Sequence, residues 1–160
     1  MSQESEAKRV NLFSLDRSAL QAFFVAEGEK AFRARQVMKW IYHRGELDFD
    51  AMTDLSKRQR GWLAERCRLD LPEVVSRQDS RDGTIKWVVR VGNGNCVETV
   101  LIPERGRNTL CVSSQVGCML DCSFCSTGKQ GFNGNLDTSD IIGQVWLADQ
   151  TLRTRGEPVS

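Results

Sequence analysis

Three cysteines within eight residues constrain this chain more than any other feature. They are Cys118, Cys122 and Cys125, at the spacing C-x3-C-x2-C. Thiolates this close in sequence can converge on one soft metal centre, so the spacing predicts a metal site in a single loop. A structural zinc or a closed four-iron cluster uses four protein ligands, whereas three ligands leave one metal position open. An open position accepts a substrate or cosubstrate, and the triplet therefore indicates catalysis.

Other uses of these thiols stay open at this stage. A fourth ligand from Cys67, Cys96, Cys111 or His43 would make a structural zinc site, although none of them stands at a zinc-ribbon spacing. The three thiols could also be buried and inert. A disulfide framework is the least favoured alternative, because no apolar signal segment follows Met1.

Composition narrows the class of protein without naming a partner. The chain has 160 residues, which predicts one domain or two small ones, and its net charge of +1 does not indicate nucleic-acid binding. No apolar run approaches the ~20 residues of a membrane helix. The sequence therefore predicts a cytoplasmic protein with reduced cysteines and no membrane span.

The N-terminal part of the chain is predicted to be helical. One helix is expected over about 14–28, with Ser14 as its N-cap. A second is expected over 32–43 and a third over 56–67. The third begins with a Ser-x-x-Gln capping box formed by Ser56 and Gln59. Apolar residues at helical spacing are expected to face the core: Leu20, Phe23, Phe24, Ala34, Val37, Met38 and Ile41.

Two of these helical segments are basic. Residues 30–44 contain five basic residues and no acid, and residues 57–68 contain five against one acid. Arg35, Lys39 and His43 recur every four residues on the face opposite the apolar stripe. A solvated helix face explains such charges as well as RNA binding does, and on composition alone it is the favoured explanation.

Beyond Pro72 the hydrophobic pattern changes to period two. Apolar residues alternate with others over 85–91, the turn residues Gly92–Asn95 follow, and 96–102 is the return strand, so this stretch predicts a β-hairpin. The next strand is expected at Leu110–Ser113.

The cysteine loop lies between that strand and a helix. The helix is expected from about Thr138, with an apolar stripe of Ile141, Val145, Ala148 and Leu152. Strand, ligand loop and helix is the order of a βα unit whose site lies at the carboxyl end of the strand.

The residues around the triplet resemble a known family. With Phe124 directly before the last cysteine, C-x3-C-x2-C resembles the cluster motif of the radical S-adenosylmethionine superfamily. The longer runs 109–118, 125–132 and 141–146 closely resemble the bacterial dual-specificity methyltransferases that act on carbon 2 of adenine in 23S ribosomal RNA and transfer RNA. The resemblance extends from about Leu15 to Trp146.

This resemblance implies an α+β fold. It predicts a small helical, RNA-binding N-terminal domain over 1–71, a linker and β-hairpin over 72–107, and the start of a radical S-adenosylmethionine barrel over 108–160. A complete (β/α)8 barrel takes about 250 residues, so only the first βα unit of a truncated barrel is expected. The family's methyl-carrying cysteine has no counterpart here, and we expect no RNA methylation by these 160 residues alone.

The resemblance also assigns roles to five residues. It implies that Cys118, Cys122 and Cys125 bind a [4Fe-4S] cluster, whose remaining iron binds S-adenosylmethionine. Glu98 corresponds to the carboxylate that accepts a proton at the substrate carbon, and Cys111 to the thiol that resolves a covalent RNA–protein intermediate. Without the resemblance, Glu98 is predicted to be an exposed strand residue and Cys111 a buried one.

The implied partners are 23S ribosomal RNA, transfer RNA and an electron donor such as flavodoxin, with the protein expected to be a monomer. Two alternatives accompany this prediction. One is the related family that methylates carbon 8 of adenine in ribosomal RNA. The other is a non-catalytic, cysteine-rich metal-binding module, which would bind zinc and be colourless.

Overall fold

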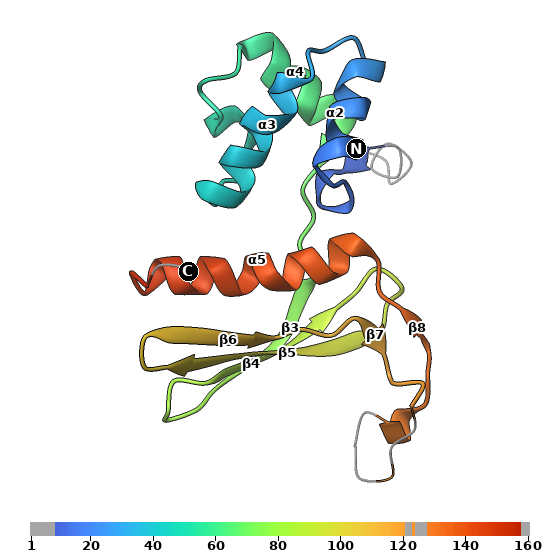
Figure 1. Ribbon diagram of the computed structural model, residues 1–160, viewed down its shortest axis with the longest axis vertical. Helices are drawn as coiled ribbons and strands as arrows, with labels where there is room; N and C mark the ends of the chain where they lie inside the picture. The colour runs from blue at the N-terminus through green and yellow to red at the C-terminus, as the bar shows by residue number, and fades with distance from the viewer. Residues whose placement is uncertain (1–8, 121–122, 124–127, 158–160) are drawn as a thin grey trace. The chain divides into compact units, whose positions relative to one another are not determined.

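The computed structural model describes residues 9–120, 123 and 128–157 (Figure 1). The chain divides into two compact units, Met1–Asp70 and Leu71–Ser160, called here the helical unit and the sheet unit. Each is described by itself. Within the described residues, no helix has both the length and the apolar character needed to cross a membrane.

The described part of the helical unit, from residue 9 onward, contains three α-helices and several short elements. In chain order these are β1 (Val10–Asn11), η1 (Leu12–Ser14), α2 (Arg17–Ala26), α3 (Phe32–Met38), the π-helical η2 (Lys39–His43), η3 (Phe49–Ala51), α4 (Lys57–Arg66) and β2 (Cys67–Arg68). Strand β1 pairs in parallel with β2. Helix α3 continues directly into η2, as the single predicted helix over 32–43 requires.

The predicted N-cap of the first helix is wrong. Helix α2 begins at Arg17, and its N-cap is Asp16, whose carboxylate accepts a hydrogen bond from the Ala19 N–H at 2.7 Å. Ser14 instead ends the 3-10 turn η1. The predicted capping box of Ser56 and Gln59 is present at the start of α4, and both of its hydrogen bonds are made.

The sheet unit is built on one antiparallel sheet in the order β3-β4-β5-β6. Its strands are β3 (Glu73–Asp79), β4 (Ile85–Arg90), β5 (Cys96–Glu104) and β6 (Arg107–Cys111). The remaining elements are β7 (Gln115–Val116), η4 (Gly128–Gln130), β8 (Gly134–Asn135) and α5 (Thr138–Thr154). The predicted hairpin is the β4–β5 pair, and β6 runs antiparallel to β5.

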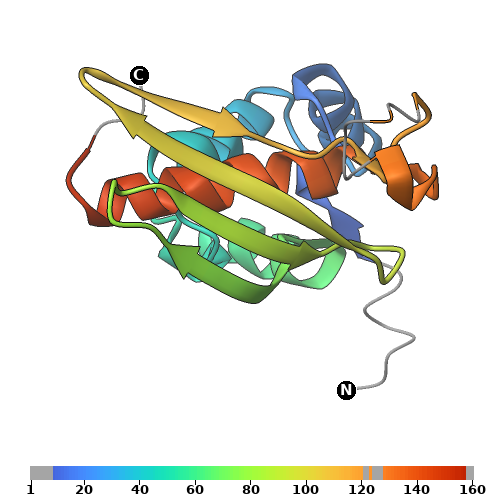
Figure 2. The same ribbon diagram turned by 90° about the horizontal axis from the view of Figure 1, so that it is seen from below.

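Helix α5 covers one face of this sheet (Figure 1). Alternate residues of β4 and β5 form the core with it, among them Trp87, Val89 and Leu101, none more than 1% exposed. Ala148 and Leu152 complete this core from α5. We call this side of the sheet the covered face. The opposite side, the open face, is turned toward the viewer in Figure 2, and no described helix of the sheet unit lies on it.

The predicted stripe of α5 is wrong at one position. Val145 is 43% exposed, whereas its polar neighbour Gln144 is fully buried. The buried row therefore passes through Gln144, Ala148 and Leu152. A polar side chain can occupy this row because hydrogen-bond partners surround it, as described below.

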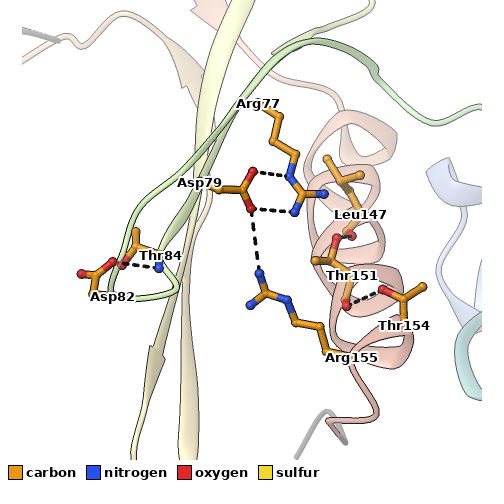
Figure 3. Close-up of polar contacts among 8 residues, drawn as sticks. All are labelled: Arg77, Asp79, Asp82, Thr84, Leu147, Thr151, Thr154 and Arg155. Carbon is orange, nitrogen blue, oxygen red and sulfur yellow. Dashed lines mark hydrogen bonds and ion pairs between the residues drawn. The ribbon is translucent and has the colours of Figure 1, made fainter.

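At the edge of the sheet, charged residues link β3 to the end of α5 (Figure 3). Asp79 accepts hydrogen bonds from the Nε and Nη2 of Arg77 at 2.8 and 2.7 Å. Nη2 of Arg155, just beyond α5, lies 3.9 Å from the same carboxylate. Strand β3 is exposed along its whole length and carries a bulge between Val74 and Ser76. It lacks the alternation that reveals β4, so sequence patterning did not predict it.

Candidate functional site

The ends of the cysteine loop are held together by short-range pairing. Strand β7 pairs antiparallel with β8, Val116 opposite Gly134. The Asn133 N–H donates to the Val116 carbonyl at 2.8 Å, and the Leu136 N–H donates to the Ser114 carbonyl at 2.9 Å. A loop whose ends are closed in this way has already lost much of the entropy that ligand convergence costs.

Gly117, the residue before the first cysteine of the triplet, is required by this closure. Its φ is +71°, and a Cβ placed on it would lie 1.6 Å from the carbonyl oxygen of Gly131. That oxygen belongs to the backbone of the returning segment, so no side-chain rotation relieves the overlap. Only glycine lets the two strands of the loop approach this closely.

Cys118 follows Gly117 at the entry to the loop. Its side chain is half-buried, and its Sγ accepts a hydrogen bond from the Leu120 N–H at 3.5 Å. Cys122 and Cys125 lie outside the described residues, so the convergence of the three thiols stays a prediction. Within the described part of the chain, no three His, Cys, Asp or Glu side chains gather as a metal site.

What the structure describes of this loop fits an iron–sulfur cluster. Its donors are thiols, the soft ligands that such clusters use. A backbone N–H directed at a cluster thiolate is one of the interactions that tune cluster potentials, and Cys118 has one.

Glu98 and Cys111 lie on the same face of the sheet. The covered face takes Val97, Thr99 and Leu101 of β5, so Glu98 and Val100 point to the open face. Cys111 stands directly opposite Val100, which makes it a diagonal neighbour of Glu98 at a typical spacing of about 7–8 Å. The two residues given catalytic roles by resemblance are therefore brought together.

The exposure of Glu98 agrees with the prediction from patterning, whereas the exposure of Cys111 contradicts it. The Glu98 side chain is 60% exposed, as an open-face strand residue should be, and its carboxylate lies 3.0 Å from Lys86 Nζ. Cys111 is also exposed, whereas patterning alone predicts a buried cysteine. The physical reason is register, because the inward position of β6 is occupied by Leu110 opposite Leu101.

The remaining thiols differ in accessibility. Cys96 is exposed at the start of β5. Cys67 is fully buried, and burial, assisted by the nearby Glu27 carboxylate, raises the pKa of its thiol to about 12. A thiol with that pKa is almost entirely protonated at neutral pH and is a poor metal ligand or nucleophile.

The helical unit has a basic groove of its own. Arg17, Arg35, Met38, Lys39, Tyr42 and His43 line a hollow of about 360 Å³. The predicted row of Arg35, Lys39 and His43 forms part of this lining, and all three are exposed. Arg17 was missed by sequence reasoning because it comes from α2, on a different helix from the row.

Two aromatic residues near this groove have different environments. Tyr42 lines the groove, and burial raises the pKa of its hydroxyl. Trp40 is only 8% exposed, and the Arg44 guanidinium lies 3.9 Å from the centre of its ring. Tyr42 and not Trp40 is therefore the aromatic side chain available to a ligand in this groove.

Comparison with known proteins places the helical unit in a family. Residues 10–69 match the family model described as "Ribosomal RNA large subunit methyltransferase N-terminal domain". The helical unit is therefore similar to that domain over most of its length.

Similarity to curated relatives continues through the sheet unit. Over 150 residues, the chain is 57% identical to the dual-specificity RNA methyltransferase RlmN of Francisella tularensis subsp. novicida (strain U112). It is 55% identical to the RlmN of F. tularensis subsp. holarctica (strain LVS) over the same length. In each case the alignment covers 93% of this chain and 40% of the relative, so the chain spans about two fifths of these relatives' length.

A solved structure shares the fold. A radical SAM methyltransferase from Sphaerobacter thermophilus matches with a TM-score of 0.84 and 38% identity, over 94% of this chain and 44% of that one. The family recognised from the residues around the cysteine triplet, and the α+β fold that it implies, are thereby confirmed.

Proposed function

We propose that this chain supplies the cluster loop and an RNA-binding unit of a radical S-adenosylmethionine methyltransferase that acts on carbon 2 of adenine in 23S ribosomal RNA and transfer RNA. The observation that carries the proposal is the sheet unit's layout. The cysteine loop begins at Cys118, follows strand β6, and has its ends held together by the pairing of β7 with β8. Strand β6 places Cys111 beside Glu98 on the open face. The similarity to RlmN proteins names the reaction.

Each residue has a distinct part in this reaction. Cys118, Cys122 and Cys125 hold a [4Fe-4S] cluster, which together with S-adenosylmethionine supplies radical chemistry when bound. Glu98 accepts a proton from the substrate carbon, and Cys111 resolves the bond between RNA and protein. Lys86 Nζ lies 3.0 Å from the Glu98 carboxylate, so the two side chains form an ion pair on the open face.

Anaerobic iron–sulfur reconstitution of the 160-residue chain tests the cluster. We expect a brown, oxygen-labile species with about four irons per chain. Cys118→Ala, Cys122→Ala or Cys125→Ala should abolish it. Cys96→Ala is the matched control, because it removes an exposed thiol outside the loop and should leave the iron content unchanged. Stoichiometric zinc without iron in the parent chain would favour the non-catalytic metal module instead.

The basic groove is the proposed contact with RNA. It offers several cations and the Tyr42 ring, and no acidic side chain contributes to its described lining. Cations bind phosphates and aromatic rings stack on unpaired bases, so this lining suits an RNA segment with at least one accessible base.

A salt titration of RNA binding tests the groove. Arg35→Gln and Lys39→Gln should each weaken binding of a transfer RNA and reduce the slope of log affinity against log salt by about one. Lys57→Gln is the control, since Lys57 is an exposed lysine at the start of α4 outside the groove lining. Unchanged affinity and slope in both groove variants would remove this surface from the proposal.

The proposal extends to the setting of the reaction. Reduction of the cluster requires a one-electron donor such as flavodoxin, and the reaction takes place in the cytoplasm on a monomeric protein.

A further inference from the structure

We infer, on the basis of the proposed function, that Gln144 of α5 is a positioning residue. It holds the segment between Cys111 and Cys118 in place and so sets how both thiols lie relative to Glu98. Gln144 itself is fully buried and touches none of the reacting groups that the proposed function names.

The segment in question lacks a complete strand partner. Strand β6 ends at Cys111 and β7 begins at Gln115, so Ser113 lies in the gap between them. The side chain of Gln144 takes the place of the strand partner that Ser113 lacks. Its Oε1 accepts from the Ser113 N–H, and its Nε2 donates to the Ser113 carbonyl, both at 2.9 Å. This double exchange is the pairing that one strand residue makes with another.

The amide of Gln144 uses its full hydrogen-bonding capacity. In addition to the bonds with Ser113, Oε1 accepts from Thr99 Oγ1 at 2.7 Å, and Nε2 donates to the Asp140 carbonyl at 3.1 Å. A primary amide has two acceptor lone pairs and two donor hydrogens, and all four are occupied. No other uncharged side chain of this length supplies the same set, because only an amide combines two donors and two acceptors.

These contacts lead directly to the proposed reaction site. Thr99 follows Glu98 on β5 and points to the covered face, toward Gln144. Ser113 Oγ donates to the Glu98 carbonyl at 2.7 Å, so Ser113 is tied to Glu98 and to Gln144 at once. Cys111 is two residues before this junction, and Cys118 is five residues after it.

Burial of this amide is tolerated because its hydrogen bonds replace those it would make with water. Removing an amide from water without such compensation costs roughly 1–3 kcal/mol, and an apolar residue here would leave the Ser113 N–H and carbonyl without the partners that Gln144 supplies. The amide is therefore best explained by the segment that it orients. Because a buried network with every member satisfied specifies one arrangement, it is suited to fixing the positions of neighbouring groups.

Hydrogen exchange measured by NMR on the reduced, metal-free 160-residue chain tests this role. In Gln144→Met, a change that preserves length and removes all four hydrogen bonds, the Ser113 amide should exchange roughly tenfold faster. The amide resonances of Cys111 and Cys118 should shift, while exchange at Trp87 in β4 stays within about twofold of the parent. Gln150→Met is the matched control, the same substitution further along α5, and should leave Ser113 exchange unchanged.

Two outcomes would overturn the inference. One is unchanged Ser113 exchange in Gln144→Met. The other is acceleration by the same factor at Ser113 and Trp87, which would make Gln144 a contributor to general stability alone. If Gln144→Met does not fold, Gln144→Asn is judged by the same criteria, because it keeps an amide that is one methylene too short to reach every partner.

The same variants separate this inference from the proposed function. Exchange at Ser113 is measured without metal, so it decides the positioning role whether or not the parent chain assembles a cluster. If the parent does assemble one, we expect Gln144→Met to alter the electron paramagnetic resonance signal of the reduced cluster, and Gln150→Met to leave it unchanged. Failure of assembly in the parent would contradict the proposed function and leave the exchange result standing.

Discussion

The two faces of the four-stranded sheet have different tasks. On the covered face, Trp87, Val89 and Leu101 are almost completely buried against α5. On the open face, Glu98 and Cys111 are exposed. Because strand side chains alternate, the residues that stabilise the fold and those proposed for chemistry are sequence neighbours that never share an environment. Substitutions in adjacent positions should therefore have sharply different consequences.

The largest difference is expected between Trp87 and its neighbour Val88. Trp87→Ala removes a side chain that is 1% exposed from the core and should lower the free energy of unfolding by about 3–5 kcal/mol. Val88→Ala, on the open face, should cost about 1 kcal/mol or less. Urea denaturation of both variants measures the difference. Similar losses in the two would mean that the open face is covered in solution.

The next effect concerns the point where the sheet passes into the cysteine loop. Gly117→Ala places a methyl group against the Gly131 carbonyl and should destabilise the loop by about 3 kcal/mol or more, since backbone must move. Gly131→Ala is the control. It has a similar φ of +70° but meets nothing within 4 Å, so only the conformational cost of about 1–2 kcal/mol applies.

Thermal unfolding and iron content after reconstitution measure this pair of variants. We expect Gly117→Ala to unfold at the lower temperature and to hold less iron than Gly131→Ala. Equal iron content in the two variants would show that cluster assembly does not depend on the close approach of Gly117 to Gly131.

Sequence reasoning succeeded where a residue's environment follows from periodicity. The alternation of Ile85, Trp87 and Val89 predicted the hairpin, and Ser56 with Gln59 predicted the start of α4, because these signals are local. The cysteine spacing and its neighbours identified the family for the same reason. The roles of Glu98 and Cys111 came from resemblance and not from any physical signal in the strands.

It failed where an environment depends on distant partners. Gln144 looks like a surface residue in sequence, and Val145 looks like core, yet hydrogen bonds to Thr99 and Ser113 reverse the two. Arg17 joins the groove of Arg35 only through the packing of two helices. Strand β3 joins the sheet through backbone pairing with β4, which its exposed side chains do not reveal in the sequence.

The thiol of Cys111, on the open face, should react faster than the buried thiol of Cys67. With its pKa raised to about 12, the Cys67 thiol is almost wholly protonated at pH 8, and burial also blocks access. Cys111 is exposed. In the folded, metal-free chain, iodoacetamide should therefore modify Cys111 at least about 100-fold faster than Cys67.

Mass spectrometry of peptides from a time course measures both rates, and urea-unfolded protein provides the control. The difference should disappear there, because unfolding removes the burial that protects Cys67. Comparable rates in the folded chain would show either that Cys111 is covered or that the helical unit opens readily.

The smallest effect concerns a place where the two-face comparison fails. Arg77 and Asp79 stand opposite Trp87 and Ile85 and so belong to the covered side, yet both are exposed because β3 is the sheet edge.

Hydrogen bonding from Arg77 lowers the pKa of the Asp79 carboxyl. A lowered folded-state pKa stabilises the fold above the unfolded value of about 3.9, and this contribution is lost as pH falls through the lower value. Arg77→Met should therefore reduce the Tm at pH 7 by about one degree at most, since the pair is solvent-screened, and the difference should vanish once the pH falls below the lowered pKa of Asp79. Arg81→Met removes one positive charge from the adjacent turn and controls for net charge. A loss of the same size in that control at pH 7, or a loss in Arg77→Met that persists at low pH, would show that the hydrogen-bonded pair itself does not stabilise the sheet edge.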